Sequence, residues 1–139
     1  MPAPPRSDCP IAMSLDILGD RWTLVVMRDI LVGLRHSFSE IGAGEGIATN
    51  VLSERLERLV ETGIVERQKD PLDGRRRIYL PTERGIALIP VLLELVVWGT
   101  AHTSSDILTD LVTSIQADRD AVIAEFTSRA RESRTANSV

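Results

Sequence analysis

Residues 49–82 read TNVLSERLERLVETGIVERQKDPLDGRRRIYLPT, and the hydrophobic period changes within this stretch at Gly63. Before Gly63 the apolar residues recur three and four positions apart, which is the spacing of an amphipathic helix. Thr49 is a suitable N-cap for this helix, and a glycine commonly follows a helix C-terminus. The stretch therefore predicts a helix over residues 49–62, with an apolar stripe of Val51, Leu52, Leu56, Leu59 and Val60.

The second half of the stretch predicts a β-hairpin. Residues 64–69 and 75–80 have the composition and alternation of strands, and the DPLDG sequence at 70–74 is typical of a turn. Five basic and three acidic residues between positions 65 and 79 give a local net charge of +2. We therefore expect a basic hairpin tip, formed by Arg75, Arg76 and Arg77.

Further helices are predicted before residue 49. Pro10 opens a helical pattern that ends at Gly19, and Asp20 is the expected N-cap of the next helix, which Gly33 ends. Phe38 to Ile41 are expected to form a short helix with Ser37 and Glu40 as a capping box, followed by a glycine-rich turn at 42–46.

Two helical regions are predicted after the hairpin. Residues 82–98, capped by Thr82, are apolar most of the way round, which indicates a helix buried on two sides. In so small a domain, the second side suggests a partner subunit. Residues 103–131 fit either one long amphipathic helix or two helices broken near 116–119.

This order of elements is that of a winged helix-turn-helix: mainly α with a small β-hairpin, and with additional N- and C-terminal helices for dimerisation. The expected organisation is a flexible N-terminal arm (1–8), a DNA-binding domain (9–99), a C-terminal extension for dimerisation or a ligand pocket (100–131) and a disordered tail (132–139).

The winged helix-turn-helix architecture reads DNA with one helix and one hairpin. The N-terminal residues of a recognition helix reach base edges in the major groove, and a basic hairpin tip contacts phosphates or the minor groove. The residues expected to contact DNA are Arg21, Arg35, His36, Ser37, Thr49, Asn50, Ser53, Arg55, Arg75, Arg76 and Arg77.

The bulk composition excludes several classes of protein. The single cysteine of the 139 residues excludes a disulfide scaffold, and the histidines are too isolated for a metal site. No catalytic constellation, signal segment or membrane-spanning run is predicted, so we expect a cytoplasmic protein that is not an enzyme and needs no cofactor. The net charge of −4 argues mildly against a nucleic-acid partner, although the basic hairpin argues for one.

Several segments resemble the HxlR-type transcription regulators in order and separation. They are CP at 9–10, LDILGDRWTL at 15–24, FSEI at 38–41, VLSERL at 51–56, ETGIVER at 61–67, YLPTERG at 79–85 and WG at 98–99. The resemblance implies a dimeric bacterial winged-helix regulator, here expected to be a repressor that binds a pseudo-palindromic operator in double-stranded DNA. It also implies that a cysteine near the N-terminus senses electrophiles or oxidants in some members.

Other interpretations remain open at the level of sequence. Cys9 is either such a sensor or a structural cysteine, and a small-molecule effector bound by the C-terminal helices is a further possibility. The alternative function is a winged-helix protein-interaction module that does not bind DNA. A homodimer interface is expected at Ile11, Leu15, Leu92, Leu95, Val96, Trp98, Leu108 and Leu111.

Overall fold

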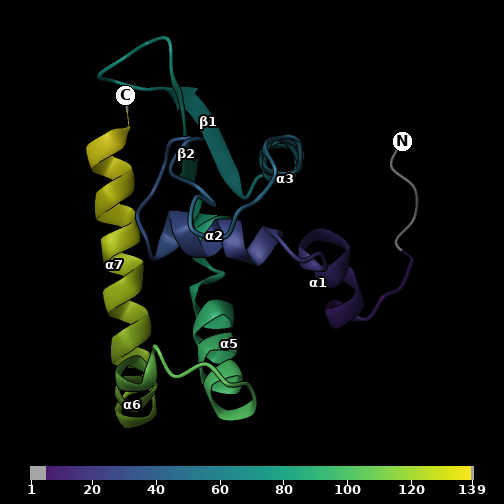
Figure 1. Cartoon of the computed structure of the whole chain (residues 1–139), viewed down its shortest axis with the longest axis vertical. Helices are drawn as coiled ribbons and strands as arrows, with labels where there is room; N and C mark the ends of the chain where they lie inside the picture. Colours follow the sequence, from purple (N-terminus) through teal and green to yellow (C-terminus); the bar gives the residue numbers. More distant parts are fainter. Residues whose placement is uncertain (1–5, 139) are drawn as a thin grey trace.

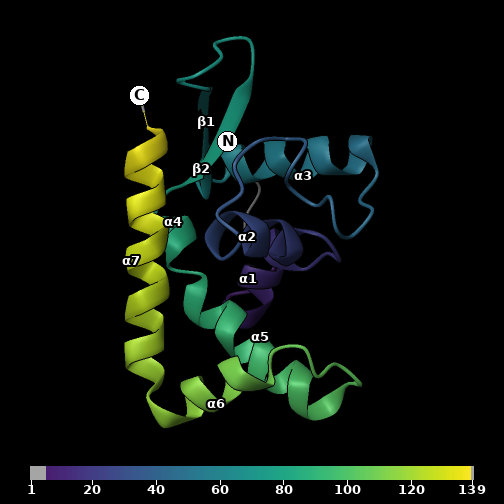
Figure 2. The same cartoon turned by 60° about the vertical axis from the view of Figure 1, so that its left-hand side comes forward.

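The computed structural model describes residues 6–138 as helices arranged around one antiparallel β-hairpin (Figure 1). The hairpin and α3 lie at one end of the molecule, and α6 lies at the other (Figures 1 and 2). The predicted class, mainly α with a small hairpin, is confirmed. The elements are α1 (Pro10–Leu18), α2 (Thr23–Leu31), α3 (Thr49–Glu61), β1 (Val65–Lys69), β2 (Arg77–Pro81), α4 (Glu83–Ile86), α5 (Ile89–His102), α6 (Thr109–Ala117) and α7 (Arg119–Asn137).

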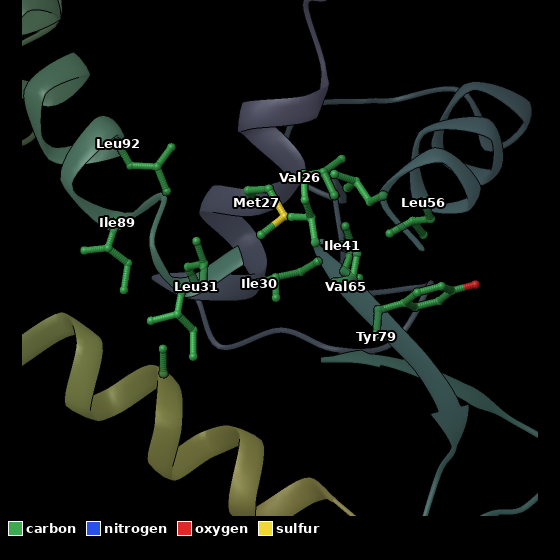
Figure 3. Close-up of a cluster of buried hydrophobic side chains, with 14 of the residues drawn as sticks. Val26, Met27, Ile30, Leu31, Ile41, Leu56, Val65, Tyr79, Ile89 and Leu92 are labelled. Carbon is green, nitrogen blue, oxygen red and sulfur yellow. The ribbon is translucent and has the colours of Figure 1, made fainter. Parts of the chain in front are cut away.

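The hydrophobic core joins α2 to α3 and the hairpin. Met27 and Ile30 of α2 are fully buried, and they belong to the same cluster as Leu56 of α3 and Val65 of β1 (Figure 3). A fully buried aliphatic side chain contributes about 1.5–3 kcal/mol. The predicted apolar stripe of α3 is confirmed at Leu52, Leu56 and Leu59, which are its buried residues.

The segment between α2 and α3 is a series of turns rather than the short helix predicted at 38–41. The Ser37 hydroxyl donates to the Glu40 side chain instead of accepting the Glu40 N–H, so the predicted capping box is wrong and no helix follows. Gly42 has a φ of 74°, and its N–H donates to the buried Asp29 carboxylate at 2.7 Å. This left-handed residue turns the chain away from a helical path.

The hairpin has a longer turn than predicted. The strands pair from Val65 opposite Pro81 to Lys69 opposite Arg77. The Arg76 N–H donates to the Asp73 carbonyl at 2.9 Å, so Arg75 and Arg76 belong to the turn. On the other edge of β2, the Tyr79 N–H donates to the His36 carbonyl at 2.8 Å, which fixes the chain before α3 against the hairpin.

The helix predicted over 82–98 is two helices, α4 and α5. Thr82 is confirmed as N-cap, because its hydroxyl accepts the Gly85 N–H. Pro90 then removes a donor that would bond to the Ile86 carbonyl, so the chain turns at 87–88 and restarts as α5. The run Glu83–His102 is long and apolar enough to cross a membrane, judged by length and composition only. Core helices of soluble proteins meet the same criterion.

The C-terminal extension consists of two helices that are separated at Asp118. The Asp118 carboxylate accepts the Ala121 N–H at 3.1 Å and caps α7, which settles the alternative left open by the sequence. α7 continues to Asn137, so the expectation of a disordered tail is wrong for residues 132–137. The remaining parts of the predicted arm and tail, residues 1–5 and 139, lie outside the described residues.

Candidate nucleic-acid interface

The exposed N-terminus of α3 is the first part of the candidate interface. Thr49, Asn50 and Ser53 are all exposed on its first two turns. Ala48 is the N-cap residue and no side chain caps the helix, so the predicted capping role of Thr49 is wrong. These three short side chains are therefore free to donate to or accept from base edges.

Arg55 lies on the same helix but is held by the protein itself. Its Nε is 3.1 Å from Asp20 Oδ1, and its Nη1 is 3.2 Å from Glu54. Partial burial acts to raise the pKa of Asp20, but hydrogen bonds from Thr23 and Trp22, together with the charge of Arg55, outweigh it and lower the pKa. The geometry therefore favours Arg55 as a link between α3 and the start of α2 over a free contact to DNA.

From Glu54 onward, α3 presents an acidic surface. Glu54, Glu57 and Glu61 line a shallow depression with Asn50, Ser53 and Arg58. Glu57 pairs with Arg67 of β1 at 2.8 Å. Carboxylates repel phosphates, so only the part of α3 before Glu54 is suited to the DNA backbone. The sequence-based prediction did not include this limit on the part of α3 that can approach DNA. Glu54, Glu57 and Glu61 are three and four positions apart, a spacing that places them on one face of a helix.

The turn of the hairpin is the second part of the candidate interface. The Arg75 side chain is 92% exposed and lies 3.2 Å from Asp73, while Arg76 is 4.0 Å from Asp70. Arg77 is exposed and has no ion pair among residues 6–138. Leu72, at 97% exposure, is an apolar tip that the sequence analysis missed. Exposed ion pairs are weak, so these arginines exchange their partners for phosphates at little cost.

His36 and Ser37 do not belong to an exposed interface. Both are buried, and Ser37 is taken up by Glu40. His36 Nδ1 lies 3.2 Å from the Tyr79 carbonyl and must donate to it, so the neutral ring accepts from the Ser133 hydroxyl at Nε2, 2.7 Å away. The prediction that these side chains contact DNA is not supported, because both are buried and the His36 ring is bonded to α7.

The burial of His36 predicts a pH dependence of stability. Burial lowers the pKa of His36, against smaller opposing effects of the Tyr79 carbonyl and Glu40. The folded state thus favours the neutral ring, and this stability is present above the unfolded pKa of about 6.5 and lost as the pH falls through the folded pKa. We expect the melting temperature of the protein to fall between pH 7.5 and 5.

The matched variant for this measurement is His36→Gln, which retains a donor and an acceptor but does not titrate. Its melting temperature should fall less over the same pH range than that of the unchanged protein. Parallel profiles for the two proteins would show that other groups cause the loss.

Arg21 and Arg35 are both exposed, in different surroundings. The Arg21 guanidinium lies over the Trp22 ring, 4.7 Å from its centroid. Arg35 follows Leu34, which has a φ of 54°, and lies beside the groove between α2 and α5. Stacking on the Trp22 ring orients the Arg21 side chain, whereas the Arg35 side chain lies beside an apolar groove. Contact of either residue with DNA stays a prediction.

Cys9 is the N-cap residue of α1 and is exposed. It makes no cap hydrogen bond that fixes its side chain, but the N–H groups of Ala12 and Ile11 at the helix start favour the thiolate and lower the pKa of the thiol. A lowered pKa and an exposed sulfur are the requirements for a reactive cysteine. The position therefore allows chemistry with electrophiles.

We expect Cys9 to react with iodoacetamide at a lower pH than an ordinary thiol does. The measurement is the alkylation rate from pH 6 to 10 for the folded protein and for the same protein in denaturant, where the α1 N–H groups are dispersed. The midpoint should be lower in the folded protein. Coincident midpoints would show that α1 does not activate the thiol.

The residues expected at a dimer interface divide into two groups. Ile11, Leu15, Leu95, Trp98 and Leu108 are exposed, and α1 has no buried residue at all. Val96 and Leu111 are half-buried, while Leu92 is buried in the core of its own chain. Leu92 is thus unavailable to a partner. Within residues 6–138 no group of three His, Cys, Asp or Glu side chains is placed to hold a metal ion.

Comparisons with known proteins bear on this arrangement. Residues 17–107 match the family model of the HxlR-like helix-turn-helix. An uncharacterized HTH-type transcriptional regulator of Mycobacterium tuberculosis, Rv3095, is 35% identical over 92 residues, which are 66% of this chain and 58% of the relative. The HTH-type transcriptional regulator YodB of Bacillus subtilis is 35% identical over 93 residues, 66% of this chain and 82% of YodB.

The solved structures agree with the fold. The reduced form of YodB from B. subtilis covers 72% of this chain and all of its own chain, at a TM-score of 0.56 and 33% identity. Other solved forms of YodB are diamide-treated and quinone-bound. The named relatives are transcriptional regulators and not enzymes, and the structural match to YodB extends over 72% of this chain. The chain therefore belongs to the HxlR-like helix-turn-helix family.

Proposed function

We propose that this protein is a homodimeric, sequence-specific DNA-binding transcription regulator that acts in the cytoplasm as a repressor. The observation that supports this function is the pairing of two exposed features at one end of the molecule (Figure 2). One is the uncapped start of α3 with Thr49, Asn50 and Ser53, and the other is the arginine-rich turn of the hairpin. The family to which the chain belongs has the same two elements.

The proposed docking uses α3 and the hairpin turn for different tasks. Asn50 and Ser53 contact base edges in the major groove, where one good contact contributes about 1–3 kcal/mol of discrimination. Arg75 and Arg77 contact phosphates of the flanking backbone or minor groove. The glutamates begin at Glu54, next to Ser53, so they limit how closely the rest of α3 approaches the phosphates.

The exposed apolar side chains of α1 and α5 support a homodimer. Ile11 and Leu15 on α1 and Trp98 on α5 are large and accessible, and such residues are usually covered by a partner. Two-fold symmetry would place two copies of α3 in successive major grooves, about 34–36 Å apart. We therefore expect a roughly palindromic operator.

Cys9 is the proposed sensing residue. Its lowered pKa at the α1 N-terminus and the location of α1 on the proposed dimer surface would couple modification of the thiol to DNA affinity. YodB, a member of the family, has been solved in a quinone-bound form and in a diamide-treated form.

A protein-interaction module without DNA binding is the second candidate. The acidic surface of α3 favours it, because Glu54, Glu57 and Glu61 would suit a basic protein partner. The exposed arginines of the hairpin turn favour the first function.

The experiment that separates the two candidates is selection from a pool of random duplexes at 50 mM and 200 mM salt, followed by sequencing. Enrichment of a two-fold symmetric motif, with binding that weakens as salt rises, is the expected result. Binding that is absent, or that does not respond to salt, would reject the proposed function in favour of the interaction module.

Glu57→Gln is expected to strengthen DNA binding. The change removes a negative charge beside the proposed DNA surface and releases Arg67 from its ion pair. For a dimer, we expect a gain of roughly fivefold in affinity for the selected duplex at 0.1 M salt.

The matched control is Glu94→Gln on α5, which also removes an acid paired with an arginine, Arg119. Fluorescence anisotropy of labelled duplex measures both variants. An equal gain from Glu94→Gln would attribute the effect to net charge and not to the position of Glu57.

A further inference from the structure

A groove of about 610 Å³ lies between α2, α5, α6 and α7. This volume is within the roughly 300–1,000 Å³ typical of sites for small organic ligands. The walls of the groove are mainly apolar. Two of its helices, α2 and α5, lie within residues 17–107, which match the family, and the other two, α6 and α7, lie in the C-terminal extension. Representative lining residues are Leu24 and Val25 of α2, Leu92 and Val96 of α5, Leu111 of α6 and Phe126 of α7.

Charged side chains occupy only one edge of the groove. Arg28 pairs with Asp29 at 3.0 Å and with Glu45 at 2.9 Å, and Asp29 also accepts the N–H of Gly42. These three charged groups are therefore satisfied by one another and by the backbone. Arg35 is the fourth, and it has no ion pair or side-chain hydrogen bond within residues 6–138.

We propose that this groove binds a small amphipathic carboxylate. Its apolar body would lie between α2, α5 and α6, where transfer from water is favourable by about 25 cal/mol per Å². Its carboxylate would lie at Arg35, whose planar guanidinium matches a carboxylate in a bidentate arrangement. A cationic ligand would be repelled by the unpaired Arg35 guanidinium, and a neutral apolar ligand would make no ion pair with it.

The proposed dimer residues Ile11, Leu15 and Trp98 do not line the groove, although Leu95 and Leu108, which are also expected at the interface, border it. Val91 and Trp98 of α5 are exposed and do not line the groove, whereas Leu92 and Val96 line it and are buried or half-buried. Leu95 alone of the exposed α5 residues borders the groove. A second copy can therefore cover the outer face of α5 while the groove stays accessible.

The groove is connected to both parts of the proposed DNA surface. Glu45 lies in the loop that leads into α3, and it reaches Arg28 at the groove edge. Phe126 belongs to α7, which also holds the hairpin, because Arg134 bonds to the Pro81 carbonyl and pairs with Glu66 at 2.9 Å. A ligand would thus bias the position of α3 and of the hairpin. This coupling rests on the proposed function, whereas binding itself does not.

Calorimetric titration of the full chain with decanoate, and with 1-decanol as the uncharged probe, tests the site. Arg35→Gln should weaken decanoate by about fivefold, the effect of one exposed charge, and leave 1-decanol unchanged. Leu111→Trp and Val32→Trp fill the groove from two walls and should each weaken both probes at least tenfold. Melting curves establish that the variants fold, and Val32 is exposed enough to tolerate the change.

The control variant is Arg119→Gln, which removes an arginine of the extension that does not line the groove. It should leave decanoate affinity unchanged. Absence of decanoate binding, or binding that both tryptophan variants retain, would overturn the site. Equal weakening by Arg35→Gln and Arg119→Gln would overturn the choice of a carboxylate. If decanoate binding disappears as the protein dimerises, the groove would be occupied by the second copy of the chain and not by a small ligand.

A gel shift of the selected duplex, with and without decanoate, separates the two proposals. Duplex binding without decanoate binding would reject the groove site alone. Decanoate binding by a protein that binds no duplex would reject the proposed function and leave the site intact. Binding of both, with a decanoate-dependent change in duplex affinity that Leu111→Trp abolishes, is the expected result.

Discussion

Replacing Arg75, Arg76 and Arg77 together by glutamine is expected to weaken binding to the selected duplex by about four thousandfold at 0.1 M salt. Consecutive residues near a strand alternate in direction, so about two of the three reach DNA from each subunit. A dimer then loses about four phosphate contacts, each worth roughly eightfold at this salt concentration. The slope of log affinity against log salt should fall by between about 3 and 4. Anisotropy titrations at several salt concentrations measure both quantities.

The control for this variant is Arg119→Gln with Arg129→Gln, which removes two arginines from α7. Both are already paired with acids, and Arg119 lies at the end of α7 away from the hairpin (Figure 1). We expect only a small loss of affinity and an unchanged salt slope. A comparable loss in the control would mean that total charge, and not the hairpin turn, drives association.

Gly85→Ala is expected to destabilise the protein by more than about 3 kcal/mol. A Cβ at this buried position would lie 2.3 Å from the Ile64 carbonyl oxygen, which is backbone and cannot move aside as a flexible side chain would. The same carbonyl accepts the Thr82 N–H at 3.1 Å, so the base of the hairpin and the start of α4 are fixed together. Urea denaturation or a melting curve measures the loss.

Gly74→Ala is the matched control, because a Cβ there meets no atom within 4 Å and the residue has no left-handed backbone. A surface change of this kind alters stability by about 0.5 kcal/mol or less. Similar melting temperatures for Gly85→Ala and the unchanged protein would contradict the close approach of α4 to Ile64.

The elements that could be predicted from sequence are those specified by local patterns. α3 and the hairpin follow from the change of period at Gly63. Asp20 accepts the N–H groups of Trp22 and Thr23, but the N-cap residue of α2 is Trp22, so the expected cap is two residues too early. The break between α4 and α5 was missed although Pro90 was visible, because the apolar pattern continues through it.

The errors at the candidate site have a different cause, which is contact between distant parts of the chain. His36 and Ser37 have the composition of an exposed loop, but Ser37 bridges to Ile78 of β2 and His36 bonds to Ser133 of α7, 97 positions later in the sequence. Arg55 is removed from the free surface by Asp20, on another element. No periodicity within one segment contains such information, and pairings of this kind require the three-dimensional structure.

The attachment of α7 to the hairpin has a consequence for how the protein is made. Ser133, Arg134 and Asn137 bond to His36, Glu66 and Gln68 across separations of 97, 68 and 69 residues. Contacts of such long range form late, since the intervening chain must first be ordered. On the ribosome, the hairpin emerges with one side uncovered, and it stays so until α7, the helix that supports it, has been translated. A nonsense mutation between residues 108 and 132 would therefore release a chain with an intact family domain and an unsupported hairpin.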